Sequence, residues 1–471
     1  MVFSSTTFLI AFLPVTLIAY YVIGVKLTKN ITVKNIILLL ASLVFYAWGE
    51  PLYIVLMVIS ILFNYTVGRA MASSRETGNS KRVKAQFIFA IVFNLGMLGF
   101  FKYIGFLFGT VNSVFGTDIQ SLAFPLPVGI SFYTFQILSY IIDLYRGNIE
   151  VQKNPISFAL YISLFPQLIA GPIVKYKDIA KQLSFRKENA DDFSRGITRF
   201  TVGLAKKLIF ANTLGAVYTI IQNGGTKDLS VVGAWIGIIC YTLQIYFDFS
   251  GYSDMAIGLG GMFGFRFNEN FRYPYIAASV TDFWRRWHIS LSTWFKEYVY
   301  IPLGGNRRKT PRVILNLMIV WMLTGLWHGA AWNFVLWGVF YGVLLILEKY
   351  VLAGALEKIP TPVRYILTML CVMVGWVLFS SPSLAAAGEY LGVMFGGAEF
   401  INSQAIYIFS ANFIVIILGA FCATPLYRKA LRSFSIQTIG KLKMAAYPLL
   451  FILCMIFMIS ETYNPFLYFR F

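Results

Sequence analysis

The sequence predicts an all-α, polytopic membrane protein in which a ring of about ten spanning helices surrounds broken or re-entrant central helices. Hydrophobic residues make up 58% of the 471 residues and charged residues only 13%, against about 25% charged in soluble proteins. Long apolar runs recur from one end of the chain to the other. We therefore interpret residues 1–471 as a single integral membrane domain.

Uninterrupted apolar runs mark the predicted spans, because a helix needs about 20 mostly apolar residues to cross a bilayer. The first run, from Phe8 to Val25, has no basic segment before it and no small-residue cleavage site after it. We interpret it as a retained helix and not as a cleaved signal peptide. The predicted spans cover residues 6–25, 35–49, 51–68, 86–101, 127–144, 196–220, 231–248, 363–380, 406–424 and 446–462.

Three further apolar stretches contain prolines or glycines that would interrupt a spanning helix. Non-helical backbone at membrane depth is tolerated only inside protein or beside water. We therefore expect these stretches to form a buried centre, with the uninterrupted helices as a wall around it. They are 155–173 (interrupted by Pro166, Gly171 and Pro172), 249–264 (rich in glycine) and 313–347 (interrupted by Gly325, Gly329 and Gly338).

The distribution of basic residues predicts the orientation. The chain carries 39 Lys and Arg against 20 Asp and Glu, a net charge of +19. No nucleic-acid-binding motif accompanies this charge, so we exclude nucleic acid as a partner and attribute the excess to the positive-inside rule. With the N-terminus outside, nearly all cationic loops fall in the cytoplasm, and the outer segments hold only Lys102, Lys227 and Arg470. We predict a multi-pass protein, surrounded by membrane lipids, with both termini extracytoplasmic.

One of the two histidines, His328, lies between two apolar stretches, in segment 326–333. An ionisable group at membrane depth is costly and indicates function. A neutral imidazole there can accept a proton from a hydroxyl as a general base, and the small Gly329 leaves room for a substrate. The same local residues equally fit a core histidine that bonds a carbonyl and packs on Trp327 and Trp332.

The second histidine, His288, follows Arg285 and Arg286 in the segment 282–290. Arginine recognises phosphate bidentately, so a phosphorylated thioester donor could bind here. The alternative is a juxtamembrane anchor, because arginine and tryptophan gather at membrane interfaces. The local residues alone favour the anchor.

Three aspartates, Asp248, Asp254 and Asp282, are interpreted as structural acceptors for buried amides, hydroxyls or arginines. Asn333 is given the same structural polar role. Metal ligation would need more oxygen or nitrogen ligands than these segments supply, and no Cys/His cluster exists for zinc. The four cysteines all lie in apolar runs and form no disulfide framework. We predict no metal site.

Four segments carry a specific combination of motifs. They are 125–136 (PLPVGISFYTFQ), 165–173 (FPQLIAGPI), 246–256 (YFDFSGYSDMA), and 282–329, which contains DFWRRWH, YIPLGG and LWHG. Together they resemble the membrane-bound O-acyltransferase (MBOAT) family, and within it the bacterial, AlgI-like branch of alginate O-acetylation proteins. The similarity extends over most of the chain and is densest over 125–350, which we interpret as a catalytic core within the single domain.

The resemblance implies roles for individual residues. His328 matches the signature histidine of the family, and His288 stands where many eukaryotic members have Asn or Asp, so both are candidate catalytic residues. Members of the family enclose a tunnel that a thioester donor enters from the cytoplasm. We expect acetyl-CoA, or another acyl thioester, as the donor substrate, without a bound cofactor, and we expect it to bind near Arg285, Arg286 and Lys296. Whether His328 acts as a general base or carries the acyl group itself stays open.

By the same resemblance, the protein would lie in a bacterial inner membrane and work with a separate extracytoplasmic O-acetyltransferase. That partner would complete the O-acylation of a polysaccharide or cell-wall polymer. Two other classes of protein compete with this interpretation. A transporter or flippase for lipid-linked polysaccharide fits the broken helices, although no inverted repeat is visible. A structural subunit of a synthase would tolerate replacement of both histidines.

Overall fold

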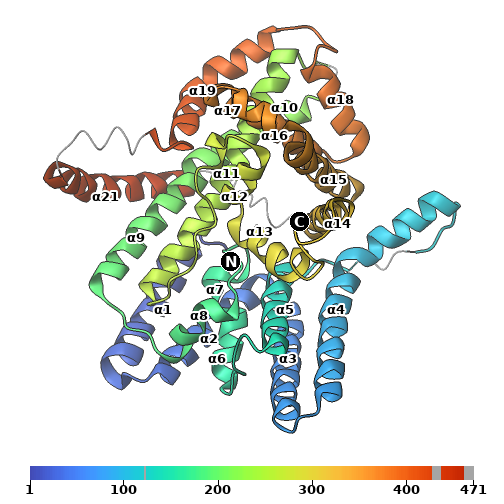
Figure 1. Ribbon diagram of the computed structural model, residues 1–471. Helices are drawn as coiled ribbons and strands as arrows, with labels where there is room; N and C mark the ends of the chain where they lie inside the picture. Colours follow the sequence, from blue (N-terminus) through green and yellow to red (C-terminus); the bar gives the residue numbers. More distant parts are fainter. Residues whose placement is uncertain (121–123, 227, 427–435, 461–471) are drawn as a thin grey trace. The chain divides into compact units, whose positions relative to one another are not determined.

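The computed structural model describes residues 1–120, 124–226, 228–426 and 436–460, and these form helices and connecting segments without any strand (Figure 1). Ten helices in this part of the chain are long and apolar enough to cross a membrane. The predicted all-α, polytopic fold is confirmed. The chain divides into two compact units, Met1–Phe200 with Met255–Asn268, and Thr201–Asp254 with Glu269–Phe471.

The first unit begins with a continuous helix that alternates between π and α geometry, and continues through α8. Within it, α3, α4 and α5 lie side by side (Figure 1). Its elements are η1 (Thr7–Phe12), α1 (Leu13–Ile18), η2 (Ala19–Thr28), α2 (Ile31–Gly49), α3 (Tyr53–Glu76), α4 (Ser80–Phe115), α5 (Ile130–Arg146), α6 (Pro155–Ser163), α7 (Phe165–Leu168) and α8 (Tyr176–Ser184).

The second unit contains both histidines. Two helices, α9 (Ala190–Ala205) and α11 (Val231–Met262), contribute residues to both units. The remaining elements are η3 (Lys206–Ala211), α10 (Asn212–Asn223), η4 (Pro274–Ile276), α12 (Val280–Arg286), α13 (Ile289–Phe295), η5 (Lys296–Tyr300), α14 (Thr310–His328), α15 (Trp332–Leu347), η6 (Glu348–Leu352), α16 (Ala353–Lys358), α17 (Thr361–Ser380), α18 (Leu384–Met394), α19 (Ser403–Cys422) and α21 (Ile436–Ser460).

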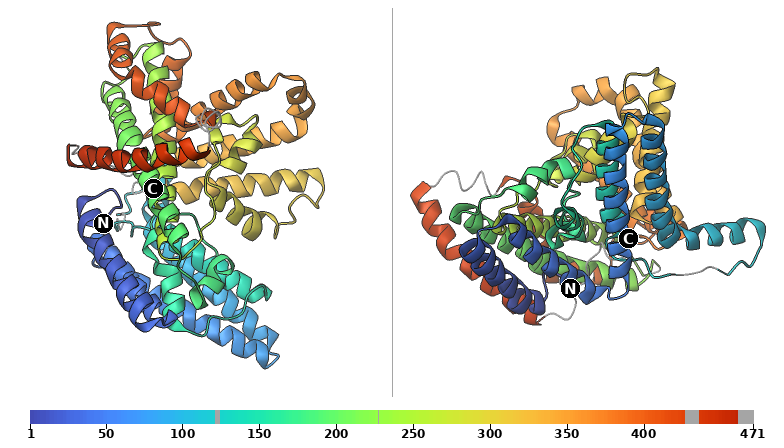
Figure 2. Two further views of the ribbon diagram at one scale, coloured as in Figure 1. Left: turned by 90° about the vertical axis from the view of Figure 1, so that its left-hand side faces the viewer. Right: turned by 90° about the horizontal axis from the view of Figure 1, so that it is seen from below.

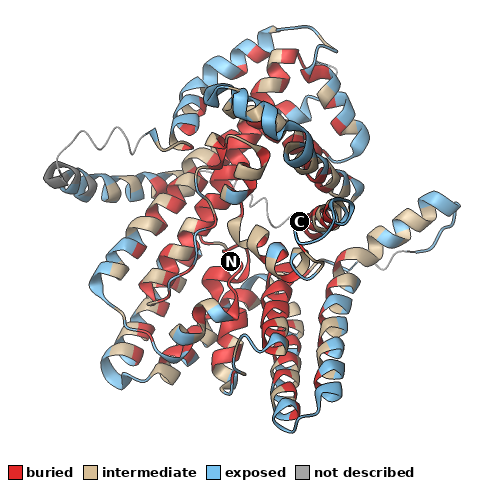
Figure 3. Ribbon diagram, viewed as in Figure 1, coloured by how far each residue is buried: buried red, intermediate tan, exposed pale blue. Residues whose placement is uncertain are grey.

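Burial separates the apolar helices into two kinds. In the most apolar 18-residue stretch of α11, 83% is buried inside the protein. In the corresponding stretch of α19, only 22% is buried. Figure 3 shows the same contrast, with buried residues concentrated along α5 and α11. A helix that is apolar all round and buried belongs to a protein core, whereas exposed apolar faces such as that of α19 suit lipid.

One of the predicted spans needs revision. The run 127–144 was expected to be a wall helix, but α5 has 17 residues and is buried along nearly its whole length, so it belongs to the core of the first unit. The run 446–462 falls at the end of α21, and residues 461 and 462 lie outside the described residues. The predicted interruption at 155–173 is present, because α6 ends at Ser163 and α7 covers only Phe165–Leu168.

The prediction of a broken stretch at 249–264 is wrong, because α11 runs without interruption to Met262. Its glycines serve close packing instead. A Cβ atom on Gly251 would lie 2.8 Å from the carbonyl oxygen of Gly203, and one on Gly258 would lie 2.6 Å from that of Gly196. Small residues that let two helix backbones approach are a standard feature of packing in membranes. Glycine at these positions therefore joins α11 to α9.

The predicted break within 313–347 is located at one place only. α14 ends at His328, α15 begins at Trp332, and the two helices pack closely as a hairpin (Figure 2). Gly325 and Gly338 do not interrupt their helices. A Cβ atom on either glycine would overlap a carbonyl oxygen of the opposite helix, so both serve the packing of the hairpin.

Lys102 was expected in an outer segment, but it lies within α4 and is buried. Its Nζ atom is 3.3 Å from the Ser131 hydroxyl oxygen, to which it donates. The helix continues to Phe115 because no proline or polar run stops it. The other two cations assigned to the outer side, Lys227 and Arg470, lie outside the described residues.

Candidate active site

His328 is the last residue of α14 and is buried within the second unit. Three aromatic rings surround its imidazole nearly edge-on, with centroid distances of 5.0 Å to Trp327, 5.0 Å to Trp337 and 5.3 Å to Phe379. These rings come from α14, α15 and α17. The arrangement holds the imidazole in an apolar environment at the tip of the α14–α15 hairpin.

The break after His328 depends on Gly329. A Cβ atom at this position would overlap the ring of Phe334, so only glycine lets the chain turn this closely against α15. Asn333, in the first turn of α15, donates from Nδ2 to the carbonyl oxygen of Ser381 at 3.1 Å. It thereby joins the start of α15 to the end of α17.

His288 lies between α12 and α13, and its side chain is fully buried. Its backbone has φ of 44°, a left-handed conformation that is uncommon for a residue with a side chain. The imidazole meets the ring of Phe249 edge-on at a centroid distance of 4.6 Å. Burial lowers the pKa of the His288 imidazole to about 3, so the ring is neutral at physiological pH. The structure thus gives His288 a core position and not that of a surface anchor.

Asn270, which no sequence motif singles out, holds the segment that follows His288. Its Oδ1 atom lies 3.2 Å from His288 Nδ1 and accepts from the amide (3.2 Å) and hydroxyl (2.9 Å) of Ser290. Its Nδ2 atom donates to the Ser253 hydroxyl at 3.2 Å, and its carbonyl oxygen accepts from the Ile289 amide at 3.0 Å. Asn270 itself is buried. A single amide therefore connects α11 to the turn that carries His288.

The ring of Trp327 lies near the imidazoles of both histidines. Its ring centroid is 5.9 Å from that of His288 and 5.0 Å from that of His328. Further aromatic residues that sequence analysis did not select extend this cluster across α12, α14, α15 and α17. They are Trp284, Trp287, Trp321, Trp337, Tyr341, Trp376 and Phe379. A high local content of tryptophan was a signal that could have identified five of them.

The predicted donor-binding cations differ in exposure. Arg285 and Lys296 are exposed, whereas Arg286 is only partly exposed. The Nε atom of Arg286 donates to Asp282 at 2.8 Å, and the other oxygen of that carboxylate accepts from the Ala278 amide at 3.2 Å. Asp282 therefore accepts from an arginine and from a backbone amide.

The start of α12 is held by a carboxylate from another helix. Glu348, the first residue of η6, accepts from the amide of Val280 at 2.7 Å and from that of Thr281 at 3.1 Å. The first amides of a helix have no partner within it, and a negative charge there also complements the helix dipole. Through these hydrogen bonds, Glu348 connects the segment that leads to His288 with the C-terminal end of α15.

Asp248 and Asp254 both pair with lysines, which were not among their expected partners. Lys207 Nζ lies 2.6 Å from an Asp248 carboxylate oxygen, and both side chains are almost completely buried. Lys206 Nζ lies 2.6 Å from an Asp254 oxygen in a partly exposed pair. Both lysines are in η3, at the junction of α9 and α10. The two ion pairs therefore join η3 to α11.

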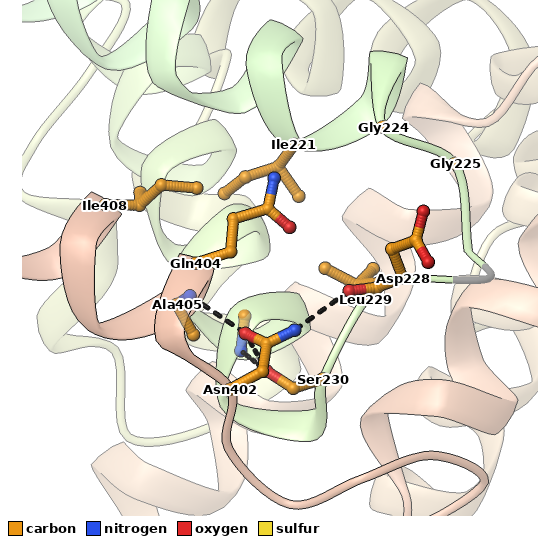
Figure 4. Close-up of a pocket in the computed structure, with 11 residues that line it drawn as sticks. Ile221, Gly224, Gly225, Asp228, Leu229, Ser230, Asn402, Gln404, Ala405 and Ile408 are labelled. Atoms are coloured by element: carbon orange, nitrogen blue, oxygen red, sulfur yellow. Dashed lines mark hydrogen bonds between the residues drawn. The ribbon is translucent and has the colours of Figure 1, made fainter.

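Among the described residues, no group of three or more His, Cys, Asp or Glu side chains could hold a metal ion. A small cavity of about 80 Å³ lies where the segment after α10 meets the start of α19 (Figure 4). Asn402 lies at its wall, donates to the carbonyl oxygen of Asp228 at 2.9 Å and accepts from the amide of Ala405. Neither histidine lines this cavity.

A sequence model of the membrane-bound O-acyltransferase family matches residues 146–386, more than half of the chain and a range that includes both histidines. The chain belongs to the membrane-bound O-acyltransferase family. It is an O-acyltransferase, and the buried imidazole pair lies inside the segment that defines the family.

Curated members of this family are similar over most of the chain. The probable alginate O-acetylase AlgI of Pseudomonas putida is 40% identical, with all of both chains covered. The protein of the same name from Pseudomonas aeruginosa is 44% identical over 84% of this chain and 75% of its own. The peptidoglycan O-acetyltransferase of Helicobacter pylori is 32% identical over 100% of this chain and 98% of its own.

Proposed function

We propose that this O-acyltransferase moves an acetyl group from cytoplasmic acetyl-CoA across the membrane for O-acetylation of an extracytoplasmic polysaccharide or cell-wall polymer. The observation that carries the proposal is that both imidazoles are buried and both lie near the ring of Trp327. Trp327 and His328 are at the tip of the apolar α14–α15 hairpin. The similarity to proteins named alginate O-acetylase and peptidoglycan O-acetyltransferase supports acetyl as the group and an outer polymer as its destination.

His328 is the proposed general base. Its neutral imidazole accepts the proton of an acceptor hydroxyl while the hydroxyl oxygen attacks the thioester carbonyl. A C–O bond forms, the C–S bond breaks, and the leaving thiolate takes the proton back from the imidazolium. Positioned proton transfer of this kind contributes about 10²- to 10⁴-fold to a rate. The aromatic rings around His328 exclude water, which protects the thioester from hydrolysis.

The position of His328 along α14 supports transfer through the membrane. The helix starts within the basic cluster 307–312, which the positive-inside rule assigns to the cytoplasm, and ends at His328. At about 1.5 Å per residue, the histidine is about 27 Å from the start of the helix, compared with a hydrocarbon thickness of about 30 Å. An acetyl group that reaches His328 has therefore travelled most of the way across, while the charged donor stays behind.

The phosphates of the donor are proposed to bind near Arg285, Arg286 and Lys296. Arg285 and Lys296 are exposed, as a phosphate-binding cation must be. On the other side, we propose that a separate extracytoplasmic O-acetyltransferase receives the acetyl group and completes the modification of the polymer. Only the acetyl group then crosses the membrane.

Membrane vesicles from the native host test the direction of transfer, because they retain the polymer and any outer transferase. Inside-out vesicles expose the cytoplasmic face, so acetyl-CoA with a labelled acetyl group should yield labelled ester inside them. Right-side-out vesicles given the same donor should yield none. Vesicles from a deletion strain are the control. Ester formation from donor supplied only to the outer face would contradict the proposal.

The orientation can be tested with single cysteines in a background without native cysteines. Lys309 precedes α14 and is exposed, and Gly225 follows α10 at the cavity of Figure 4. In intact spheroplasts, an impermeant thiol reagent should label Gly225→Cys and leave Lys309→Cys unlabelled until the membrane is permeabilised. The reverse labelling would mean that the termini are cytoplasmic.

A further inference from the structure

We propose that Asn270 is a positioning residue that holds the His288 imidazole in the Nδ1-protonated tautomer, with Nε2 as the hydrogen-bond acceptor of the ring. The inference rests on the proposed function in one respect only, namely that His288 takes part in acyl transfer. It assigns to Asn270 the task of deciding which nitrogen of that imidazole can accept a proton.

The orientation of the Asn270 amide follows from its neighbours. An asparagine side chain can be placed with its oxygen and nitrogen exchanged, so the hydrogen-bond network must decide between the two. The backbone N–H of Ser290 can only donate, and it lies 3.2 Å from the atom assigned as Oδ1. On the opposite side, Nδ2 donates to the Ser253 hydroxyl. Exchanging the two atoms would place an N–H against an N–H, so the assigned orientation is the compatible one.

The tautomer of His288 follows from that orientation. An amide oxygen has no proton to donate, so the Nδ1 atom that lies 3.2 Å from Asn270 Oδ1 must carry one. The Ser290 hydroxyl lies 3.5 Å from Nδ1. It donates a hydrogen bond to the same Oδ1 atom, so it also faces Nδ1 with a lone pair. A neutral imidazole carries one N–H, so the lone pair is on Nε2. The low pKa of the buried ring keeps it in this neutral form.

Asn270 also supports the strained backbone at His288. The Ile289 amide donates to its carbonyl oxygen and the Ser290 amide donates to its side chain, so two successive amides after the left-handed residue are bonded to Asn270. Residues in this conformation persist when their surroundings overdetermine them. One buried residue thus sets both the backbone turn and the proton position of His288, as outer partners of ligating histidines do in metal sites.

The chain is suited to a direct test, because it has two histidines. Protein labelled with ¹⁵N in the histidine rings should give two sets of ring signals, and His328→Gln should leave the set that belongs to His288. We expect that set to show a protonated Nδ1 and an unprotonated Nε2. A wild-type spectrum with the proton on Nε2 would overturn the proposal, independently of any acetyl transfer.

Three variants separate positioning from simple support of the fold. Asn270→Asp keeps an oxygen that can only accept, so the Nδ1–H tautomer should persist. Asn270→Leu removes the acceptor, and the Nε2–H form should appear. Ser253→Ala changes the other side of the same amide and is the matched control, which should keep the wild-type tautomer. If Asn270→Leu does not fold, the wild-type and Asn270→Asp spectra still decide.

Kinetics provide the second readout. Asn270→Leu should lower kcat by about 10- to 100-fold, the usual cost of losing such an outer partner, with a smaller change in the KM for acetyl-CoA. Asn270→Asp should recover most of the lost kcat. Equal loss in both variants, with an unchanged tautomer in both, would show that Asn270 is structural only and would overturn the proposal.

Discussion

Replacing His328 with Gln should reduce acetyl transfer by about 10²- to 10⁴-fold, the contribution of a positioned general base. Glutamine fills much of the space of the imidazole among Trp327, Trp337 and Phe379, but its amide does not take up a proton. The variant therefore separates lost chemistry from lost packing, which His328→Ala would confound by leaving a cavity. The measurement is the O-acetyl ester content of the outer polymers at matched amounts of membrane protein.

Thr324→Val is the matched control for this variant. Thr324 lies one turn earlier on α14, is also buried, and its hydroxyl donates to the carbonyl oxygen of Val320 in its own helix. Its replacement should leave ester content close to the wild-type level. Near-normal acetylation by His328→Gln would exclude His328 as the base, whatever the family membership of the chain.

The second large effect concerns the stability of the protein. Lys207→Met or Asp248→Leu alone should destabilise the fold by about 3–5 kcal/mol, the usual cost of removing one partner of a buried ion pair. The two side chains are 4% and 2% exposed, so water cannot replace the lost partner. We expect a marked fall in the folded, monodisperse fraction after detergent extraction and in the apparent melting temperature.

The double variant Lys207→Met/Asp248→Leu should recover most of this loss, because it buries neither charge. Arg195→Met is the control for loss of a lysine or arginine as such. Arg195 pairs with Asp192 in an exposed position, and exposed pairs contribute about 0–1 kcal/mol. If the double variant were no more stable than the single ones, the two residues would have separate roles in the fold.

The helices themselves were predictable because apolar run length is a direct consequence of membrane thickness. The role of each glycine was not. Gly329 breaks a helix, whereas Gly258 and Gly325 lie within continuous helices and let a second helix approach. A glycine that breaks a helix and a glycine that allows close packing contribute the same hydropathy to the sequence, so hydropathy does not distinguish them. What separates them is the presence of another helix backbone, and that depends on contacts distant in the chain.

The candidate site was predictable to a similar extent. His328 and His288 stand out because ionisable groups in apolar surroundings are rare. Asn270 does not stand out, because it lies in a polar connecting segment 18 residues before His288 and has no periodic or compositional signal. The aspartates were expected to accept hydrogen bonds. Their lysine partners are more than 40 positions away on another helix, a distance at which residue type alone does not indicate pairing.

The two attachments of the α14–α15 hairpin bear on how the enzyme responds to its bilayer. At the tip, Trp327 contacts the His288 imidazole, and beyond the other end of α15, Glu348 holds the first amides of α12. Helices in a membrane tilt when hydrocarbon thickness changes. A hairpin secured at both ends to the segment that carries His288 must tilt together with it. We therefore expect protein contacts to set the separation of the two imidazoles, so that a change in lipid chain length moves the site without deforming it.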